Sequence, residues 1–156
     1  MSKNLFENGS YSFQDVNAAI TGPGIDLAVS GEAEEGIDIE YEGDKSTLTM
    51  GADGSGMHSL HAALNGVITF RLLKTSPFNR AMNQAFLNQT ASAANHGKNV
   101  IVVSDLVRGD TILAAGCAFA KHAGIRYAKD GNVQEWRFLC TRITPDLGPG
   151  VDTLIL

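Results

Sequence analysis

The sequence has few cysteines, few aromatic residues and no long apolar segment. Its 156 residues include two cysteines, Cys117 and Cys140, too few for the disulfide framework that holds many small secreted domains together. We expect both to be buried free thiols in a protein kept in the cytoplasm. No segment approaches the ~20 apolar residues of a membrane-spanning helix, and the short polar start of the chain does not read as a signal peptide. Neither a secreted disulfide scaffold nor a membrane protein is expected.

Basic residues are scarce in the first part of the chain. Residues 1–65 carry eleven acidic and two basic side chains, whereas residues 66–156 carry six acidic and ten basic ones. The net charge of −5 argues against a protein that binds nucleic acid through its overall charge. The uneven distribution is typical of two opposed surfaces that meet in an assembly, although a solvated acidic face would also produce it.

Aromatic side chains make up only 7% of the sequence, whereas glycine occurs 17 times. This composition favours a turn-rich β protein over a helix bundle, and the length predicts one domain spanning residues 1–156. Within it we expect a flexible N-terminal arm at residues 1–10 and a tail with glycine and proline at residues 145–156. Apolar patterning predicts strands at residues 11–20, 25–29, 37–42, 46–50, 57–63, 67–74, 100–103, 111–121 and 133–144.

The most regular alternation lies in residues 37–42, where three apolar residues should face a core and three acidic ones should face away from it. The apolar residues are Ile37, Ile39 and Tyr41. The acidic residues are Asp38, Glu40 and Glu42. Acids on one face repel each other unless water or bases meet them, so this face is exposed or lines an aqueous space. Residues 46–50 are expected to return beside this strand as a hairpin.

A glycine-rich segment, residues 51–56, follows this predicted hairpin. It precedes an expected strand at residues 57–63, and Asn65-Gly66 reads as a two-residue hairpin turn into residues 67–74, because both positions tolerate positive φ. Ordered glycines lose much backbone freedom. We therefore expect residues 51–61 to be part of a hairpin arm that becomes ordered only against a neighbouring subunit.

A helix is predicted to start at Ser76-Pro77, where serine caps the helix and proline occupies the first turn. Its apolar stripe consists of Phe78, Ala81, Met82, Ala85 and Phe86, and the opposite face carries Asn79, Arg80, Asn83 and Gln84. A single helix on a β domain must lay its apolar stripe against a sheet.

The residues with reactive side chains do not form a convincing catalytic or metal site. His58 and His61 lie near Asp53 in sequence, but positions three apart on a strand point to opposite faces. The glycine-rich segment lacks the Gly-Lys-Ser/Thr of a phosphate-binding loop and has no helix behind it. We therefore predict no enzymatic activity, no cofactor and no metal.

Seven short segments, in a fixed order, carry a resemblance to a known family. They are Tyr11-Ser-Phe-Gln-Asp-Val, Thr21-Gly-Pro-Gly, Ala33-Glu-Glu-Gly-Ile, Gly51-Ala-Asp-Gly-Ser-Gly-Met-His-Ser, Arg71-Leu-Leu-Lys-Thr-Ser-Pro, Tyr127-Ala-Lys-Asp-Gly and Glu135-Trp-Arg-Phe. From roughly residue 11 to residue 148, the sequence resembles the tail tube proteins of contractile-tailed bacteriophages, which form the inner tube inside the sheath.

The resemblance implies a β-sandwich or split barrel with one flanking helix, which joins a continuous barrel in a hexameric ring. Rings stack through a long loop into a tube with a central channel for DNA. The implied protein is a structural virion component, assembled in the cytoplasm of the bacterial host. Its implied partners are further copies of itself, the tail sheath protein, the baseplate and tail terminator proteins, and DNA that passes without specific binding. No membrane is involved.

The resemblance also implies roles for particular residues. An acidic channel wall lets DNA pass without sticking, and the residues expected to line it are Asp38, Glu40 and Glu42. The expected ring–ring contact loop contains Gly51, Asp53, Gly54, Gly56, Met57, His58 and His61. The expected helix-packing residues are Phe78, Met82 and Phe86. Two alternatives stay open: another tail component of the same fold, such as a tube terminator or baseplate adaptor, and a metal- or ligand-binding module that uses the histidines.

Overall fold

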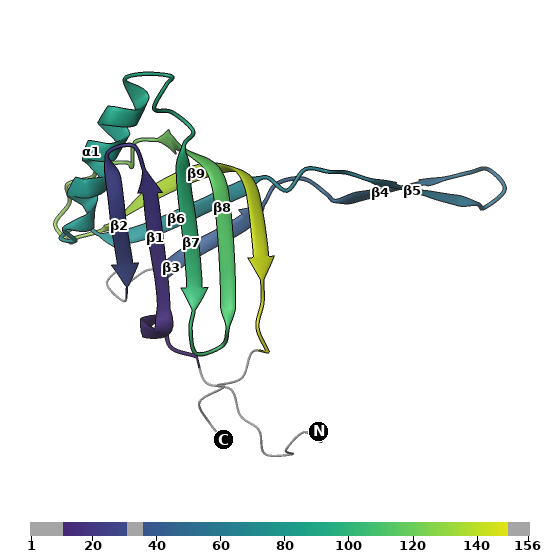
Figure 1. Cartoon of the computed structure of the whole chain (residues 1–156), viewed down its shortest axis with the longest axis horizontal. Helices are drawn as coiled ribbons and strands as arrows, with labels where there is room; N and C mark the ends of the chain where they lie inside the picture. The colour runs from purple at the N-terminus through teal and green to yellow at the C-terminus, as the bar shows by residue number, and fades with distance from the viewer. Residues whose placement is uncertain (1–10, 31–35, 150–156) are drawn as a thin grey trace, which may run out of the picture.

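The computed structural model describes residues 11–30 and 36–149. In this part of the chain, seven strands form one antiparallel sheet in the order β2-β1-β7-β8-β9-β6-β3 (Figure 1). These strands are β1 (Val16–Gly22), β2 (Ile25–Ser30), β3 (Gly36–Tyr41), β6 (Gly66–Leu73), β7 (Asn99–Asp105), β8 (Asp110–Lys121) and β9 (Val133–Asp146). Two further strands, β4 (Ser46–Met50) and β5 (Gly56–Leu60), pair with each other, and helix α1 (Phe78–Thr90) lies beside the sheet. The prediction of a mainly β protein with one flanking helix is confirmed.

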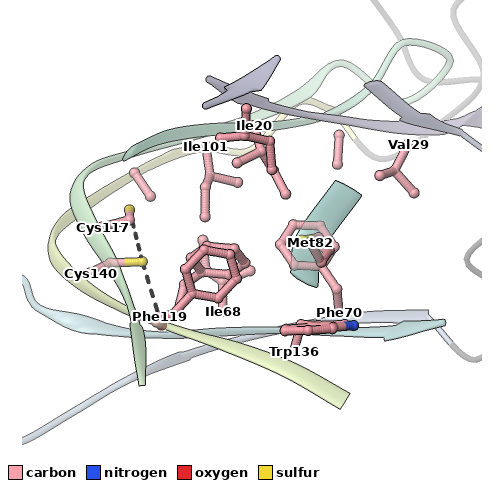
Figure 2. Close-up of a cluster of buried hydrophobic side chains, with 14 of the residues drawn as sticks. Ile20, Val29, Ile68, Phe70, Met82, Ile101, Cys117, Phe119, Trp136 and Cys140 are labelled. Atoms are coloured by element: carbon pink, nitrogen blue, oxygen red, sulfur yellow. Dashed lines mark hydrogen bonds between the residues drawn. The ribbon is translucent and has the colours of Figure 1, made fainter. Parts of the chain in front are cut away.

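The sheet curls because β8 and β9 change sides together. Ala114 and Cys117 of β8 are both buried, although strict alternation would turn the second of them outward. Their partners on β9, Ile143 and Cys140, are also both buried. Gly116 permits the bend, since its φ of 64° is a conformation that residues with a Cβ disfavour. The sheet therefore forms a curled half-barrel around its core, as Figure 2 shows.

The core lies inside this curl and is closed on one side by α1. Its largest fully buried side chains include Trp136, Phe70, Phe138, Ile20, Ile68 and Leu72. The ring of Phe119 lies 4.4 Å from that of Phe138 and 5.9 Å from that of Trp136, centroid to centroid. Each fully buried side chain of this kind contributes about 1.5–3 kcal/mol to folding, so the aromatic cluster is a main source of stability.

Helix α1 begins at Phe78, after the predicted Ser76-Pro77 start, and the hydroxyl of Ser76 accepts the amide N–H of Phe78 at 3.3 Å. Met82 is fully buried and points into the core (Figure 2). Phe78 and Phe86 pack against the core from partly buried positions. The apolar stripe of the helix therefore faces the inside of the half-barrel.

The face of α1 opposite the stripe also contacts the body. The Oδ1 atom of Asn79 accepts the indole N–H of Trp136 at 3.0 Å, and the Oδ1 atom of Asn83 lies 2.8 Å from Nε2 of His122. The sequence pattern does not indicate these contacts, because Asn79 and Asn83 differ in no visible way from solvent-facing helix residues.

The predicted hairpin between residues 37–42 and 46–50 is wrong. Strand β3 pairs with β6, which places Ile39 opposite Ile68, and β4 pairs with β5. Residues 36–73 thus form one long hairpin whose middle leaves the sheet (Figure 1). We call this projecting part, residues 46–60, the arm. Alternation predicts which residues are extended, but the choice of partner depends on the packing of β6 against β9.

The predicted hairpin turn at Asn65-Gly66 is also wrong. Neither residue has a positive φ, and Gly66 is instead the first residue of β6. A Cβ atom at this position would collide with the carbonyl oxygen of Glu40 and lie 2.7 Å from Cδ1 of Ile143. Glycine is required here because three strands meet closely at the base of the arm.

Several predicted elements end a few residues away from the observed ones, and two of these differences affect the fold. The first predicted strand begins with a 3₁₀ turn, Phe13–Asp15, before β1. Strand β9 continues to Asp146, and so enters the predicted tail. The predicted N-terminal arm and the end of the predicted tail, residues 1–10 and 150–156, lie outside the described residues.

Candidate assembly surfaces

The arm exposes four large apolar side chains to solvent. The exposed fractions are 56% for Leu48, 58% for Met50, 60% for Met57 and 81% for Leu60. A two-stranded hairpin is at best marginally stable in water by itself, and clustered apolar surface marks an interaction site. The arm therefore carries the kind of exposed apolar surface that marks an interaction site.

The pairing register of β4 and β5 divides the arm into two unlike faces. One of them, called the apolar face below, carries Ser46, Leu48, Met50, Gly56, His58 and Leu60. The opposite face carries Thr47, Thr49, Met57 and Ser59. A Cβ on Gly56 would lie 3.3 Å from atoms of both Leu48 and Met50, which places these residues on one side. The arm is amphipathic, with a hydroxyl-rich side and an apolar side.

The tip of the arm is closed by its own hydrogen bonds. The amide of Gly51 donates to the carbonyl of Ser55 at 2.6 Å, and that of Gly54 to the carbonyl of Gly51 at 3.1 Å. Asp53 accepts from the hydroxyl of Ser55 at 2.6 Å and from its amide at 3.0 Å. These bonds lower the pKa of Asp53, the hydroxyl contributing most. The tip turn therefore has its own internal hydrogen bonds; that the segment becomes ordered only against a neighbouring subunit stays a prediction.

His58 in the arm and His61 directly after it are separated, as strand geometry predicts. His58 lies on the apolar face, whereas Nε2 of His61 is 3.4 Å from Oγ1 of Thr47 on the opposite face. Among residues 11–30 and 36–149, no group of three or more His, Cys, Asp or Glu side chains is placed to hold a metal ion.

The acidic side chains of β3 meet a base. Asp38 and Glu40 are exposed, and Arg71 of β6 donates to Asp38 through Nη1 and to Glu135 of β9 through Nε, the latter at 3.0 Å. These two carboxylates raise the pKa of Arg71, Asp38 contributing most. Glu42 follows β3, where its amide donates to the carbonyl of Asn65. The solvent-facing side of β3, β6 and β9 thus carries both acidic and basic side chains.

The two cysteines lie directly opposite each other on β8 and β9, and both are buried. The Sγ atoms of Cys117 and Cys140 are 3.1 Å apart, with Cys117 donating (Figure 2). This hydrogen bond, together with burial, raises the pKa of the Cys117 thiol.

Two buried polar clusters stabilise the fold, and the sequence pattern shows neither of them. Nη1 of Arg108 lies 3.0 Å from Oδ2 of Asp105 and 3.4 Å from Oδ2 of Asp15, which joins the β7–β8 turn to the 3₁₀ turn before β1. The side-chain amides of Gln89 and Asn99 bond each other reciprocally at 2.7–2.8 Å, which fastens the end of α1 to the start of β7. Each cluster also has one distant contact, from Arg108 to Asp15 and from Nε2 of Gln89 to the carbonyl of Pro23 at 2.8 Å, and no local motif indicates these.

Within the part of the chain that the structure describes, no helix is long and apolar enough to cross a membrane. A curled sheet with an amphipathic projecting arm defines a structural subunit whose exposed surfaces serve assembly. The sequence model of the Bacteriophage PhiTE tail tube protein family matches residues 9–148. The chain therefore belongs to this family of phage tail tube proteins, and it is a component of the phage tail. No curated protein sequence matches it.

Solved structures of contractile injection systems share the fold. The chain resembles one in the PVC sheath–tube complex of an extracellular contractile injection system in its extended state, with a TM-score of 0.54, 14% identity, and coverage of 94% of this chain and 99% of the other. It also resembles a chain of the anti-feeding prophage cap, described as a tube-terminating cap, with a TM-score of 0.54, 10% identity, and coverage of 94% of this chain and 97% of the other. A third similar chain belongs to the PVC sheath/tube terminator structure, with a TM-score of 0.51, 16% identity, and coverage of 94% of this chain and 97% of the other. At these identities the likeness shows the fold alone.

Proposed function

We propose that this tail tube protein assembles as hexameric rings that stack around a channel for DNA, with the arm making the ring–ring contact. The observation that carries the proposal is the arm itself. It projects away from the body (Figure 1), and every side chain of β4 is exposed. Covering its apolar face with a neighbouring subunit removes that surface from water, at about 25 cal/mol per Å² of apolar area.

The ends of the sheet support ring closure. Strands β2 and β3 are the outermost strands of the seven-stranded sheet, and an unpaired strand edge is a template for pairing with another chain. Pairing of these edges between neighbouring copies makes one continuous barrel out of separate half-barrels.

The acidic residues Asp38, Glu40 and Glu42 are proposed to line or rim the channel. Glu40 gives the cleanest test, because Asp38 is bonded to Arg71 and its replacement would also disturb that ion pair. In phage carrying Glu40→Lys, tails are expected to assemble and DNA release to slow, since a cation holds phosphate through counterion release. The control is Asp146→Lys at the end of β9, an exposed acid on a strand that does not form an edge of the sheet. Equal DNA release by wild type and Glu40→Lys would place Glu40 away from the channel.

The proposed partners are the tail sheath protein around the tube, and the baseplate and tail terminator proteins at its ends. Assembly is proposed to take place in the cytoplasm of the bacterial host. Incubation of assembled tubes with purified sheath protein, followed by electron microscopy, tests the first of these contacts. Sheath that polymerises without covering the tubes would contradict it.

The arm proposal is tested by deletion and negative-stain electron microscopy. The amide of His61 donates to the carbonyl of Lys45 at 2.8 Å, so Asn-Gly can replace residues 46–60 and close the shortened hairpin. The wild-type protein is expected to form long hollow tubes, and the deletion variant to remain as monomers or single rings. Fluorescence of the buried Trp136 serves to check that its body is folded. Long tubes formed by the deletion variant would contradict the proposal that the arm makes the ring–ring contact.

A second candidate function is that of a tube terminator or cap. The observation in its favour is that chains from a cap and from a sheath/tube terminator structure share the fold over 94% of this chain. The same micrographs decide between the two, because a terminator would yield single rings from the wild-type protein where a tube subunit yields stacked rings.

A further inference from the structure

The end of the body opposite the arm carries a second exposed surface. Strand β6 begins at Gly66, next to the arm, and ends at Leu73. There the amide of Lys74 donates to the carbonyl of Asn132 at 3.1 Å. The loop between β8 and β9, residues 122–132, therefore lies at the far end of β6, on the side of the molecule away from the arm (Figure 1).

This far surface combines apolar and basic groups. The exposed fractions are 38% for Leu73, 58% for Ile125 and 86% for Tyr127. Lys74 Nζ donates to the carbonyl of Arg126 at 2.6 Å and lies 4.2 Å from the ring centroid of Tyr127. The cation beside the ring orients an aromatic side chain that is otherwise almost fully exposed. Such an oriented, exposed aromatic is a typical anchor of a protein interface.

The charges of the far surface and the arm are opposite in sign. Lys74, Arg126 and Lys129 contribute positive charge around Tyr127, and with Asp130 as the one acid of the same loop the surface stays positive. The arm presents Asp53 in its tip turn, between the paired ends of β4 and β5 at Met50 and Gly56. The hydrogen bonds from Ser55 favour the ionised carboxylate of Asp53, so the tip stays negative at neutral pH.

We propose that the arm of one copy docks on the far surface of a second copy, with its apolar face on Tyr127 and Ile125 and with Asp53 beside Arg126 and Lys129. This inference rests on the proposed function, because it specifies the surface that receives the arm when rings stack. The two surfaces lie at opposite ends of one chain, so their contact is head-to-tail and can be repeated without limit. Complementary charge within one sequence identifies the occupant as another copy of this chain.

Thiol cross-linking tests the contact in assembled tubes. Cysteines are introduced by Asp53→Cys and Lys129→Cys in one chain, and the tubes are treated with a short bis-maleimide. Because the native thiols are buried, the wild type supplies the background. Head-to-tail docking predicts a ladder of covalent multimers on a denaturing gel. Either single substitution alone should give no ladder, and neither should the control pair of Asp53→Cys with Lys98→Cys, since Lys98 follows the end of α1.

Charge reversal provides a second measurement. Asp53→Arg replaces attraction with repulsion, and should raise the concentration needed for tubes by about tenfold. Combining it with Arg126→Asp and Lys129→Asp in the same chain should restore most of the loss. Tubes that form normally but give no ladder would overturn this inference and leave ring stacking intact. Absence of tubes from the wild-type protein would overturn the proposed function itself.

Discussion

Replacing Gly66 with alanine tests how closely the strands meet at the base of the arm. The added Cβ would collide with the carbonyl oxygen of Glu40 on β3 and approach Cδ1 of Ile143 on β9 to 2.7 Å. The side chain of Ile143 can rotate away from the new methyl group. The carbonyl of Glu40 cannot, because it belongs to the backbone of a strand that is paired with β6. Overpacking a well-packed site costs about 1–3 kcal/mol, and separating the strands also weakens a backbone hydrogen bond worth about 1 kcal/mol. We expect Gly66→Ala to lower the free energy of unfolding by about 2–4 kcal/mol.

Urea unfolding followed by fluorescence measures this loss. The chain has one tryptophan, and Trp136 is 99% buried in the wild type, at an exposed fraction of 1%. With a typical urea dependence, the midpoint should fall by about 1–2 M. The matched control is Gly131→Ala, where an added Cβ meets nothing within 4 Å and φ is not positive. It should be neutral or slightly stabilising. Equal midpoints for the two variants would refute the close approach at Gly66.

Three further predictions concern single side chains. Asp105→Ala should lower the free energy of unfolding, because it removes the closest partner of Arg108 and the acceptor of two backbone amides, and leaves only the longer contact with Asp15; an unchanged urea midpoint would contradict this. Both cysteine thiols should resist iodoacetamide at mildly alkaline pH in the folded protein and react after denaturation in urea, as measured by mass spectrometry, because both are buried. Rapid labelling of the native protein would show that the half-barrel opens. Ser55→Ala should raise the pKa of Asp53 toward its ordinary value near 4, as followed by NMR titration. In the wild type, the tip turn should therefore weaken only as the pH falls below that value, and an unchanged pKa in the variant would show that the hydroxyl does not bond the carboxylate.

Patterns within a few residues predict local structure well in this chain. Alternation in residues 37–42 places Ile37 and Ile39 against the core, but the same expectation is wrong for Tyr41, which is 44% exposed where β3 ends. The helical spacing of Phe78 and Met82 identifies the side of α1 that packs. These predictions succeed because burial of one face repeats with the period of the strand or the helix. The ordered motifs from Tyr11 to Phe138 also lead to the tail tube family, which the family match over residues 9–148 confirms.

Strand partners could not be predicted from the same patterns. Residues 46–50 fit equally well beside 37–42 or beside 56–60, because each pairing needs only an antiparallel register and a short connection. Asn65-Gly66 has the composition of a tight turn, yet Gly66 is required by crowding from β3 and β9. That crowding arises from residues up to 77 positions away in sequence, as between Gly66 and Ile143.

The features of the candidate surfaces also fall into two groups, those predicted from the sequence and those seen only in the tertiary structure. The sequence by itself determined the β class, the single amphipathic helix, the exposed acids of β3 and the tail tube family, because these depend on composition, period and motif order. The tertiary structure alone decided that the glycine-rich segment is the tip of a projecting arm, and that Arg71 meets Asp38. It also decided that the β8–β9 loop, which carries Tyr127, lies beside the end of β6 that is away from the arm. These features depend on which distant strands pack together, and that choice is made by the free energy of the whole core.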